Sequence, residues 1–516
     1  MTTNKPNYLN VILEKFEHKH DPKLSKENIP DQCGKNADPI YLDFRFSTIC
    51  SALHEFKERG VSKTQLIEWK KELPIIYPWD CEYCELRQIV NRRFVVFPMG
   101  IVMCSKEKHV INALKKCLKY HILLCMRSGS HCYEPYSLCD GFVIDQSRRS
   151  NVIIKDRKQI AILEAGCLLG PTTALLQDKG FAFPTGTCAN VAIAGLTLGG
   201  GLGFLGRKFG LTCDNLISLD MISAKGELMK VSDDENPDLF WAMKGAGCGN
   251  FGIVTSFTFK IYPVEDVIIL ELWWDIDKLY QVLSTWLKWG PESDNNLTTE
   301  LDIYALNESN TNPHPVLITG LFIGHSKKEL KRIIKPLLDL HPLKVKMIKT
   351  TYLESVRHFA YATFPFPFHK NKSTYVYKKL PESVIPVIIK YMKKAGSEDR
   401  LEFDGLGGAY ANKRNDETAY PHRNAKAWIQ WIARWQNEDV GAKKLKWVKN
   451  FYEEFIEEAG KSVHGAYFNC PDSDLKDWPR EYFGGNLERL IKIKKKYDPN
   501  KVFRYPQGLS ELLIEN

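Results

Sequence analysis

The chain has 516 residues, of which 44% are hydrophobic and 26% are charged, and its formal net charge is +9. A chain of this length is too long for one ordinary core, so we expect at least two folded domains and little disorder. The basic residues are scattered and form no compact motif of the kind that binds DNA or RNA, which argues against a nucleic-acid-binding module.

The N-terminal segment contains no apolar signal-peptide core, and no stretch approaches the roughly 18 apolar residues that cross a bilayer. We therefore expect a soluble protein that is not secreted, lies in the cytoplasm and has no membrane partner. Fourteen cysteines in a chain of this length do not make a dense disulfide framework. The pair Cys81 and Cys84 has no second pair at the spacing of a structural zinc site, so no metal is expected.

The elements follow in chain order. Residues 1–69 are polar and irregular except for a helical pattern over 43–60, and we interpret them as an N-terminal extension. A strand–helix–strand pattern comes next, with its helix over 106–121. The predicted strands cover 94–105, 122–130, 141–147, 151–156, 159–166, 266–276 and 299–306. This order predicts an α+β protein whose cofactor-binding domain is interrupted by a substrate domain and completed by the C-terminus.

The loop after the second predicted strand combines small residues with a histidine. Arg127 to Ser130 read RSGS, and small residues leave backbone N–H groups free to bind a diphosphate. His131 follows directly at the exit of this loop. Taken alone, His131 fits a surface or packing histidine as well as a functional one.

Two glycine-rich segments follow. The segment 183–215 contains Cys188 and then three adjacent glycines. Its residues 201–206 match G-x-G-x-x-G formally, but the segment continues as RKFGLTCDN and not as an apolar helix, so we reject nicotinamide binding. Cys188 alone fits a small buried hydrophobic residue. The second segment, 236–263, passes from a glycine-rich turn into an alternating strand, whose backbone could pair with a flat ring.

In this order and spacing, the three segments resemble the FAD-binding module of the berberine bridge enzyme-like oxidases, which belong to the wider vanillyl-alcohol oxidase type of family. The C-terminal residues 482–509 resemble the closing segment of that family. The resemblance implies FAD as the cofactor and an α+β fold, in which a two-part FAD-binding domain carries an inserted α+β substrate domain built on an antiparallel sheet. We expect an extension over 1–69, the FAD-binding domain over 70–263, the substrate-binding domain over 264–460 and a returning segment over 461–516.

The resemblance also implies that FAD is attached by two covalent bonds. His131 matches the histidine that bonds the flavin 8α-methyl group, and Cys188 matches the cysteine that bonds carbon 6 of the ring. Val191 matches the position that controls the access of oxygen, where valine is typical of oxidases. The other cofactor-binding residues that the resemblance implies are Arg127, Ser128, Gly129, Ser130, Gly195, Gly199, Gly200, Gly201, Asn250, Ile253, Val254 and Asn469.

Of the four candidate catalytic residues, Tyr133 lies two residues after His131, and the other three lie further along the chain. In relatives that oxidise sugars, an aspartate three residues before a pair of glycines helps to deprotonate the substrate hydroxyl, and Asp404 stands at that position. Strand alternation puts Glu402 on the same face, although Asp404 also fits an ordinary strand carboxylate. Tyr133 matches an active-site tyrosine, and Tyr467 on the returning segment could substitute for a catalytic tyrosine that this chain lacks. Cys470 replaces the tyrosine usually assigned as the catalytic base; it could be a weak base itself.

The sequence therefore predicts an FAD-dependent oxidase that oxidises an alcohol, such as a sugar or oligosaccharide hydroxyl, and reduces oxygen to hydrogen peroxide. Its partners would be a small-molecule substrate and oxygen. An oxidase or dehydrogenase of an aromatic alcohol or secondary metabolite is the alternative enzyme, although Leu202 replaces a tyrosine of the plant relatives of that kind. A flavin-binding protein with little turnover is the third alternative, for which Cys470 is the main argument.

Overall fold

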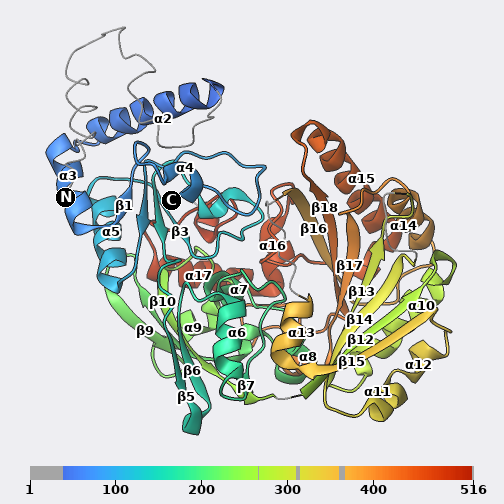
Figure 1. Cartoon of the computed structure of the whole chain (residues 1–516). Helices are drawn as coiled ribbons and strands as arrows, with labels where there is room; N and C mark the ends of the chain where they lie inside the picture. The colour runs from blue at the N-terminus through green and yellow to red at the C-terminus, as the bar shows by residue number, and fades with distance from the viewer. Residues whose placement is uncertain (1–38, 265, 309–313, 360–366, 514–516) are drawn as a thin grey trace, which may run out of the picture. The chain divides into compact units, whose positions relative to one another are not determined.

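The computed structural model describes residues 39–264, 266–308, 314–359 and 367–513 (Figure 1). The chain divides into two compact units. The first unit includes the described residues up to 88, together with 95–127 and 137–148. The second includes 89–94, 128–136 and the described residues from 149 onward. Within the described ranges, no helix is both long enough and apolar enough to cross a membrane.

The first unit is built on a four-stranded sheet with the order β1-β2-β4-β3. β2 (Gly100–Met103), β4 (Phe142–Asp145) and β3 (Leu124–Arg127) are parallel, and β1 (Ile75–Ile76) pairs with β2 in the antiparallel direction. Parallel neighbours need a crossover connection, and α5 (Glu107–Lys119), which buries its apolar side, forms one after β2. Every residue of β2 and β4 is buried, which explains why these strands read as continuous apolar runs.

Two helices that precede this sheet contribute to its core. α2 (Pro39–Glu58) agrees with the predicted helix, and α3 (Lys63–Glu72) starts at Ser62 with a capping box; the short α4 (Tyr83–Leu86) follows. The rings of Phe56 and Trp69 are buried, with centroids 6.0 and 6.2 Å from that of Phe142. The described part of the segment that we interpreted as an extension therefore packs into the first unit.

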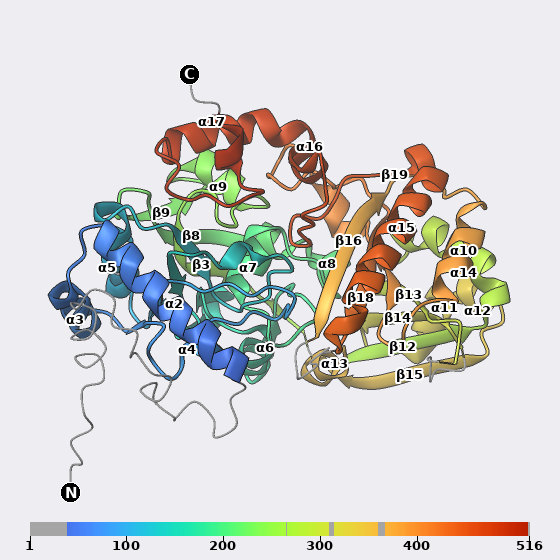
Figure 2. The ribbon, with the colours of Figure 1, turned by 90° about the horizontal axis from the view of Figure 1, so that it is seen from above.

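The second unit contains an antiparallel five-stranded sheet with the order β5-β6-β10-β8-β9. Its strands are β5 (Val152–Lys155), β6 (Ile160–Glu164), β8 (Leu216–Ile222), β9 (Leu228–Ser232) and β10 (Ile253–Lys260). The helices that share its core are α6 (Leu169–Gln177), α7 (Ile193–Leu198), α9 (Pro237–Met243), α16 (Trp478–Phe483) and α17 (Leu487–Tyr497) (Figure 2). This core joins Phe240 and Phe257 with Leu490 and Leu509, so the C-terminal segment returns to this part of the fold.

The same unit contains an antiparallel eight-stranded sheet with the order β15-β12-β14-β13-β17-β18-β16-β19. Its strands are β12 (Asp266–Trp274), β13 (Leu297–Tyr304), β14 (Val316–Ile323), β15 (Lys344–Thr351), β16 (Phe368–Val376), β17 (Arg400–Gly405), β18 (Ala427–Trp435) and β19 (Val463–His464). The apolar core of this sheet includes α10 (Leu279–Trp289), α14 (Val384–Met392) and α15 (Gly441–Ala459). Leu401 and Phe403 point into that core. Because side chains alternate, Glu402 and Asp404 lie on the opposite face.

The remaining elements are short. β7 (Phe181–Ala182) pairs with β11 (Tyr262–Pro263) in the antiparallel direction. The short helices are α8 (Gly206–Phe209), α11 (Lys327–Ile333), α12 (Lys335–Leu338) and α13 (Tyr352–Phe359). The combination of helices with a mixed four-stranded sheet and two larger antiparallel sheets confirms the α+β fold class that the sequence predicted.

Candidate active site

The loop that carries His131 approaches the segment after Cys188 closely. A Cβ atom at Gly129 would lie 2.6 Å from the backbone nitrogen of Ala192 and 2.9 Å from its Cβ. Since the obstacle is backbone, only glycine allows this approach. The two residues that we expect to bond the flavin therefore come from loops that contact each other within the second unit.

The backbone of the same loop offers hydrogen-bond donors. Ser130 adopts a left-handed conformation, with φ of 59°. Among the described residues, no acceptor receives the backbone N–H groups of Ser128, Gly129, Ser130 and His131. Free N–H groups in such a turn suit an anion, as the predicted diphosphate site requires. Arg127 ends β3 in the first unit, where its Nε lies 2.5 Å from Oδ2 of Asp145.

Burial sets the protonation states of the two candidate attachment residues. It lowers the pKa of His131 to about 4, and a hydrogen bond with Asn190 acts in the opposite direction. The imidazole is therefore neutral near physiological pH and keeps a lone pair for bond formation. Burial raises the pKa of the Cys188 thiol, against the positive charge of Arg434. The turn after Cys188 is fixed, because the Val191 N–H donates to the Cys188 carbonyl over 3.2 Å.

The glycine run packs against the returning C-terminal segment. The Gly201 N–H donates to Oη of Tyr467 over 2.9 Å, and Nδ2 of Asn469 donates to the same oxygen over 3.1 Å. A Cβ atom at Gly199 would lie 2.0 Å from Oδ1 of Asn469, so a larger residue would push this side chain away. The structure therefore brings together the predicted residues of the glycine run with Tyr467 and Asn469.

Two further glycines of this segment differ in their surroundings. Gly200 has φ of 121°, and a Cβ atom there would lie 3.0 Å from the ring of Tyr420. A Cβ atom at Gly195 would meet no atom of the described residues within 4 Å. Gly195 thus borders open space, whereas Gly200 is enclosed by protein.

The predicted residues near β10 play a different part. Oδ1 of Asn250 accepts from the Leu509 N–H over 2.9 Å, and its Nδ2 donates to the Ala246 carbonyl over 2.9 Å. The Asn250 side chain therefore holds the C-terminal segment, which leaves it little capacity for a ligand. Ile253 and Val254 begin β10 and are 1% and 4% exposed.

Four carboxyl groups gather on the face of the eight-stranded sheet that carries Asp404. β13 and β17 pair so that Glu300 lies opposite Asp404 and Asp302 lies opposite Glu402. Glu300, Asp302 and Glu402 are 5%, 1% and 8% exposed. Arg400 forms an ion pair with Glu402, and its Nε lies 3.7 Å from Oδ1 of Asp302. Sequence reasoning missed Glu300, Asp302 and Arg400; the acidic residues at alternate positions of 297–304 were a signal for them.

Three of these four carboxyl groups, those of Glu300, Asp302 and Asp404, have a pKa above their usual range. Burial raises the pKa of Glu300 well above its ordinary value, and the charge of Asp404 raises it further. Burial and the charge of Glu402 likewise raise the pKa of Asp404. A hydrogen bond joins Glu300 and Asp404, so the two carboxyl groups share a proton and titrate as a pair. Burial raises the pKa of Asp302 to about 7.

Two tyrosines connect this cluster to the glycine run. Oη of Tyr410 donates to the Gly203 carbonyl over 2.9 Å. Burial raises the pKa of Tyr410, and the negative charge of Asp404 raises it further, so Asp404 lies near Tyr410. Asp404 and Tyr467, which are far apart in the sequence, therefore approach the same glycine-rich segment.

Tyr133 and Cys470 meet at Gln430, a residue that sequence reasoning missed. Nε2 of Gln430 lies 3.4 Å from Oη of Tyr133 and 3.8 Å from Sγ of Cys470. The ring of Tyr133 also contacts His369 edge to face, with centroids 5.1 Å apart. Burial raises the pKa of Cys470 to about 12, so its thiol stays protonated near neutral pH. This protonation state argues against Cys470 as a base.

These residues fit FAD. The free N–H groups of 128–131 suit its diphosphate, and Gly195 borders space in which no described atom interferes. His131 and Cys188 supply nucleophilic atoms on loops that contact each other at Gly129 and Ala192. FAD would supply the acceptor for a hydride, and the chain would supply the groups that bind, orient and exchange protons.

Comparisons with known proteins agree with this fit. The model of the FAD binding domain family matches residues 98–232, and the model described as berberine and berberine like matches residues 466–510. The chain is 36% identical to the uncharacterized FAD-linked oxidoreductase YgaK of Bacillus subtilis over 441 residues, which covers 84% of this chain and 96% of that protein. It is 29% identical to hexose oxidase of Chondrus crispus over 481 residues, which covers 77% of this chain and 87% of that protein.

A solved structure of a berberine bridge enzyme-like protein has a similar fold. The structure of wild-type BBE-like 1 from Physcomitrella patens has a TM-score of 0.76 and 28% identity, over 84% of this chain and 96% of that chain. The resemblance to the berberine bridge enzyme-like oxidases, the vanillyl-alcohol oxidase type of fold and FAD as the cofactor are thereby confirmed. The chain belongs to the berberine bridge enzyme-like family of FAD-linked oxidoreductases.

Proposed function

We propose that this protein is an oxidase that takes a hydride from an alcohol carbon of a sugar or oligosaccharide. In this proposal FAD is held by two covalent bonds, and its electrons pass to oxygen, which becomes hydrogen peroxide. The observation that carries the proposal is the pair Glu300 and Asp404 on a buried polar sheet face. Buried polar groups with few partners mark a place where a polar ligand is expected.

Oxidation of an alcohol requires a group that accepts the hydroxyl proton while the hydride leaves the carbon. We assign this role to Asp404. Its Oδ2 is buried and has no hydrogen-bond partner among the described residues, so this oxygen is available to a substrate hydroxyl. Glu300 lies opposite Asp404 on the neighbouring strand, and a hydrogen bond joins the two carboxyl groups. The raised pKa of Asp404 suits a base that works closer to neutral pH than an ordinary carboxylate.

A sugar offers several hydroxyl groups, and each loses hydrogen bonds to water when it is buried. Side chains of the same sheet face can replace these bonds: Glu402 and Gln430 are 8% and 4% exposed, and Arg400 is 9% exposed. The similarity to hexose oxidase supports a sugar as the substrate. Two covalent bonds would hold the flavin ring in place without protein enclosing it on all sides. The substrate groove could then be wide and open, which suits an extended oligosaccharide.

The remaining roles follow from the loops around the ring. We assign the histidine–flavin bond to His131, whose imidazole is neutral, and the cysteine–flavin bond to Cys188. Val191, in the turn after Cys188, is small enough to leave oxygen access to the ring. Tyr133 and Tyr467 stay protonated near neutral pH, because burial raises the pKa of both, and they can donate hydrogen bonds to the substrate.

The test is anaerobic reduction of the purified enzyme by separate panels of hexoses, oligosaccharides and aromatic alcohols, followed by the flavin absorbance. We expect a sugar or oligosaccharide to bleach the flavin, and the reduced enzyme to release hydrogen peroxide when air is admitted. Bleaching by aromatic alcohols alone would favour the alternative substrate class. A flavin that no panel bleaches would favour a protein with little turnover.

A further inference from the structure

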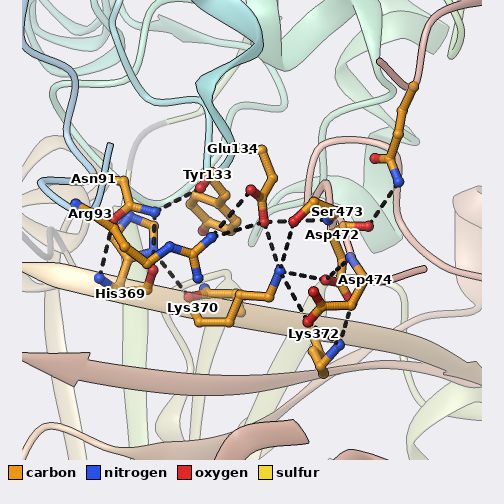
Figure 3. A network of polar contacts seen from close by, with 12 residues as sticks. Asn91, Arg93, Tyr133, Glu134, His369, Lys370, Lys372, Asp472, Ser473 and Asp474 are labelled. Carbon is orange, nitrogen blue, oxygen red and sulfur yellow. Dashed lines mark hydrogen bonds and ion pairs between the residues drawn. The ribbon is translucent and has the colours of Figure 1, made fainter. Parts of the chain in front are cut away.

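A buried network of charges lies beside the candidate active site (Figure 3). Nζ of Lys370, on β16, lies 2.7 Å from Oε1 of Glu134 and 2.5 Å from Oδ1 of Asp472. The side chains of these three residues are only 3%, 2% and 6% exposed. Burial alone would lower the pKa of Lys370, but the charges of Asp472 and Glu134 raise it above its usual value, so the ammonium group is charged.

The network contains two other cations, and each of them pairs with only one of the carboxylates Glu134 and Asp472. Arg93 pairs with Glu134 over 3.2 Å, and Lys372 pairs with Asp472 over 2.7 Å. Among the described residues, Lys370 is the cation that pairs with both Glu134 and Asp472. The Ser473 N–H also donates to Oε1 of Glu134 over 3.3 Å and joins the same two segments. Removal of the Lys370 charge would leave each carboxylate with a cation but would break the ionic link between them.

That link joins two parts of the candidate site. Glu134 follows His131 and Tyr133 on the loop 128–136, which we call the flavin loop. Asp472 follows Cys470 on the returning segment. The loop is also tied on its other side, where Nδ2 of Asn91 donates to the Tyr133 carbonyl over 2.7 Å. The turn that carries Cys188 has its own backbone hydrogen bonds and shares none of these ion pairs.

We propose that Lys370 is a positioning residue, which sets the flavin loop against the returning segment and thereby controls how completely the histidine–flavin bond forms. The inference rests on the proposed attachment through His131. Formation of that bond removes the N–H proton of the imidazole and one proton of the 8α-methyl group, and joins nitrogen to carbon. The two electrons released pass to oxygen, the acceptor of the proposed oxidase reaction, which takes up two protons and becomes hydrogen peroxide.

The experiment measures each bond separately. Lys370→Met is introduced into a Cys188→Ala enzyme, which has only the histidine attachment, and into a His131→Ala enzyme, which has only the cysteine attachment. After acid precipitation, the flavin in the pellet gives the covalently held fraction. We expect Lys370→Met to lower this fraction roughly tenfold in the first background, since small displacements of reacting groups slow reactions by such factors. The second background should keep its fraction.

Lys372→Met is the matched control, because it removes an equally buried lysine of the same strand but leaves Glu134, Lys370 and Asp472 connected. It should leave both fractions unchanged, and Lys370→Arg should restore the histidine-held fraction. Equal losses in both backgrounds, or no loss in either, would overturn the positioning role. If the Cys188→Ala enzyme with an intact network releases all its flavin, the attachment through His131 is wrong and this inference falls with it.

Discussion

Glu300 and Asp404 face each other across the paired strands β13 and β17, and a hydrogen bond joins their carboxyl groups. Asp404→Asn keeps the size of the side chain but removes its capacity to accept a proton. We expect the rate of anaerobic flavin reduction to fall roughly 10²–10⁴-fold, which is the contribution of a general base. Stopped-flow absorbance measures this rate, and the amount of bound flavin should not change. Asp302→Asn is the control, since Asp302 lies opposite Glu402; an equal loss in that variant would contradict the assignment.

The rate of flavin reduction should rise with pH. Asp404 accepts a proton only when it is ionised, and its pKa is raised well above the ordinary value, so the rate is low below that pKa and high above it. Glu402→Gln removes a charge that raises this pKa, so the rise should move to lower pH. Glu300→Leu removes the hydrogen bond that lowers it, so the rise should move to higher pH, whereas Glu300→Gln keeps a donor and should move it little. Rate–pH profiles that coincide in all variants would exclude Asp404 as the titrating base.

Cys470→Ala should keep most of the rate of flavin reduction. The pKa of this thiol is raised to about 12 by burial, so the thiolate is scarce near neutral pH and cannot act as the main base. The same anaerobic measurement tests this, and Cys470→Ser, which retains an acceptor for Nε2 of Gln430, is the companion variant. A loss in Cys470→Ala as large as that in Asp404→Asn would assign the proton transfer to the thiol.

Val191→Leu should slow the reaction of the reduced enzyme with oxygen and leave the reduction by substrate unchanged. The longer side chain fills space in the turn after Cys188, where we expect oxygen to reach the ring. The check is to mix the anaerobically reduced enzyme with oxygenated buffer and follow the return of the flavin absorbance. Val191→Ala is the control and should reoxidise as fast as the wild type. Slow reoxidation in all three proteins would indicate a dehydrogenase.

Gly129→Ala should destabilise the fold. The added Cβ would lie 2.6 Å from the backbone nitrogen of Ala192, and relief of such overpacking costs about 1–3 kcal/mol. Gly485→Ala is the matched control, because no atom of the described residues lies within 4 Å of its Cβ position, and its effect should stay within about 0.5 kcal/mol. Thermal unfolding of both variants, each with bound flavin, gives the comparison. Equal midpoints in the two variants would mean that the loops of His131 and Cys188 do not need this close approach.

The sequence by itself determined the parts of this protein that are local. The small residues before His131, the glycine run after Cys188 and the returning segment are contiguous motifs, and their order was enough to identify the family and the cofactor. Strand alternation also placed Glu402 and Asp404 on one face, because the period of a strand is a property of the backbone. The helix over 43–60 followed from its apolar spacing, but its place in the core of the first unit did not.

Only the tertiary structure decided which distant residues meet. Glu300 becomes the partner of Asp404 through the register of β13 with β17, and a shift of one residue would have turned its side chain to the apolar face. Lys370 reaches Glu134 and Asp472 because two segments that are distant in the sequence converge on β16. The register of two strands and the meeting of distant segments both depend on the packing of the whole core. Because each residue contributes little to that packing, neither feature produces a local pattern in the sequence.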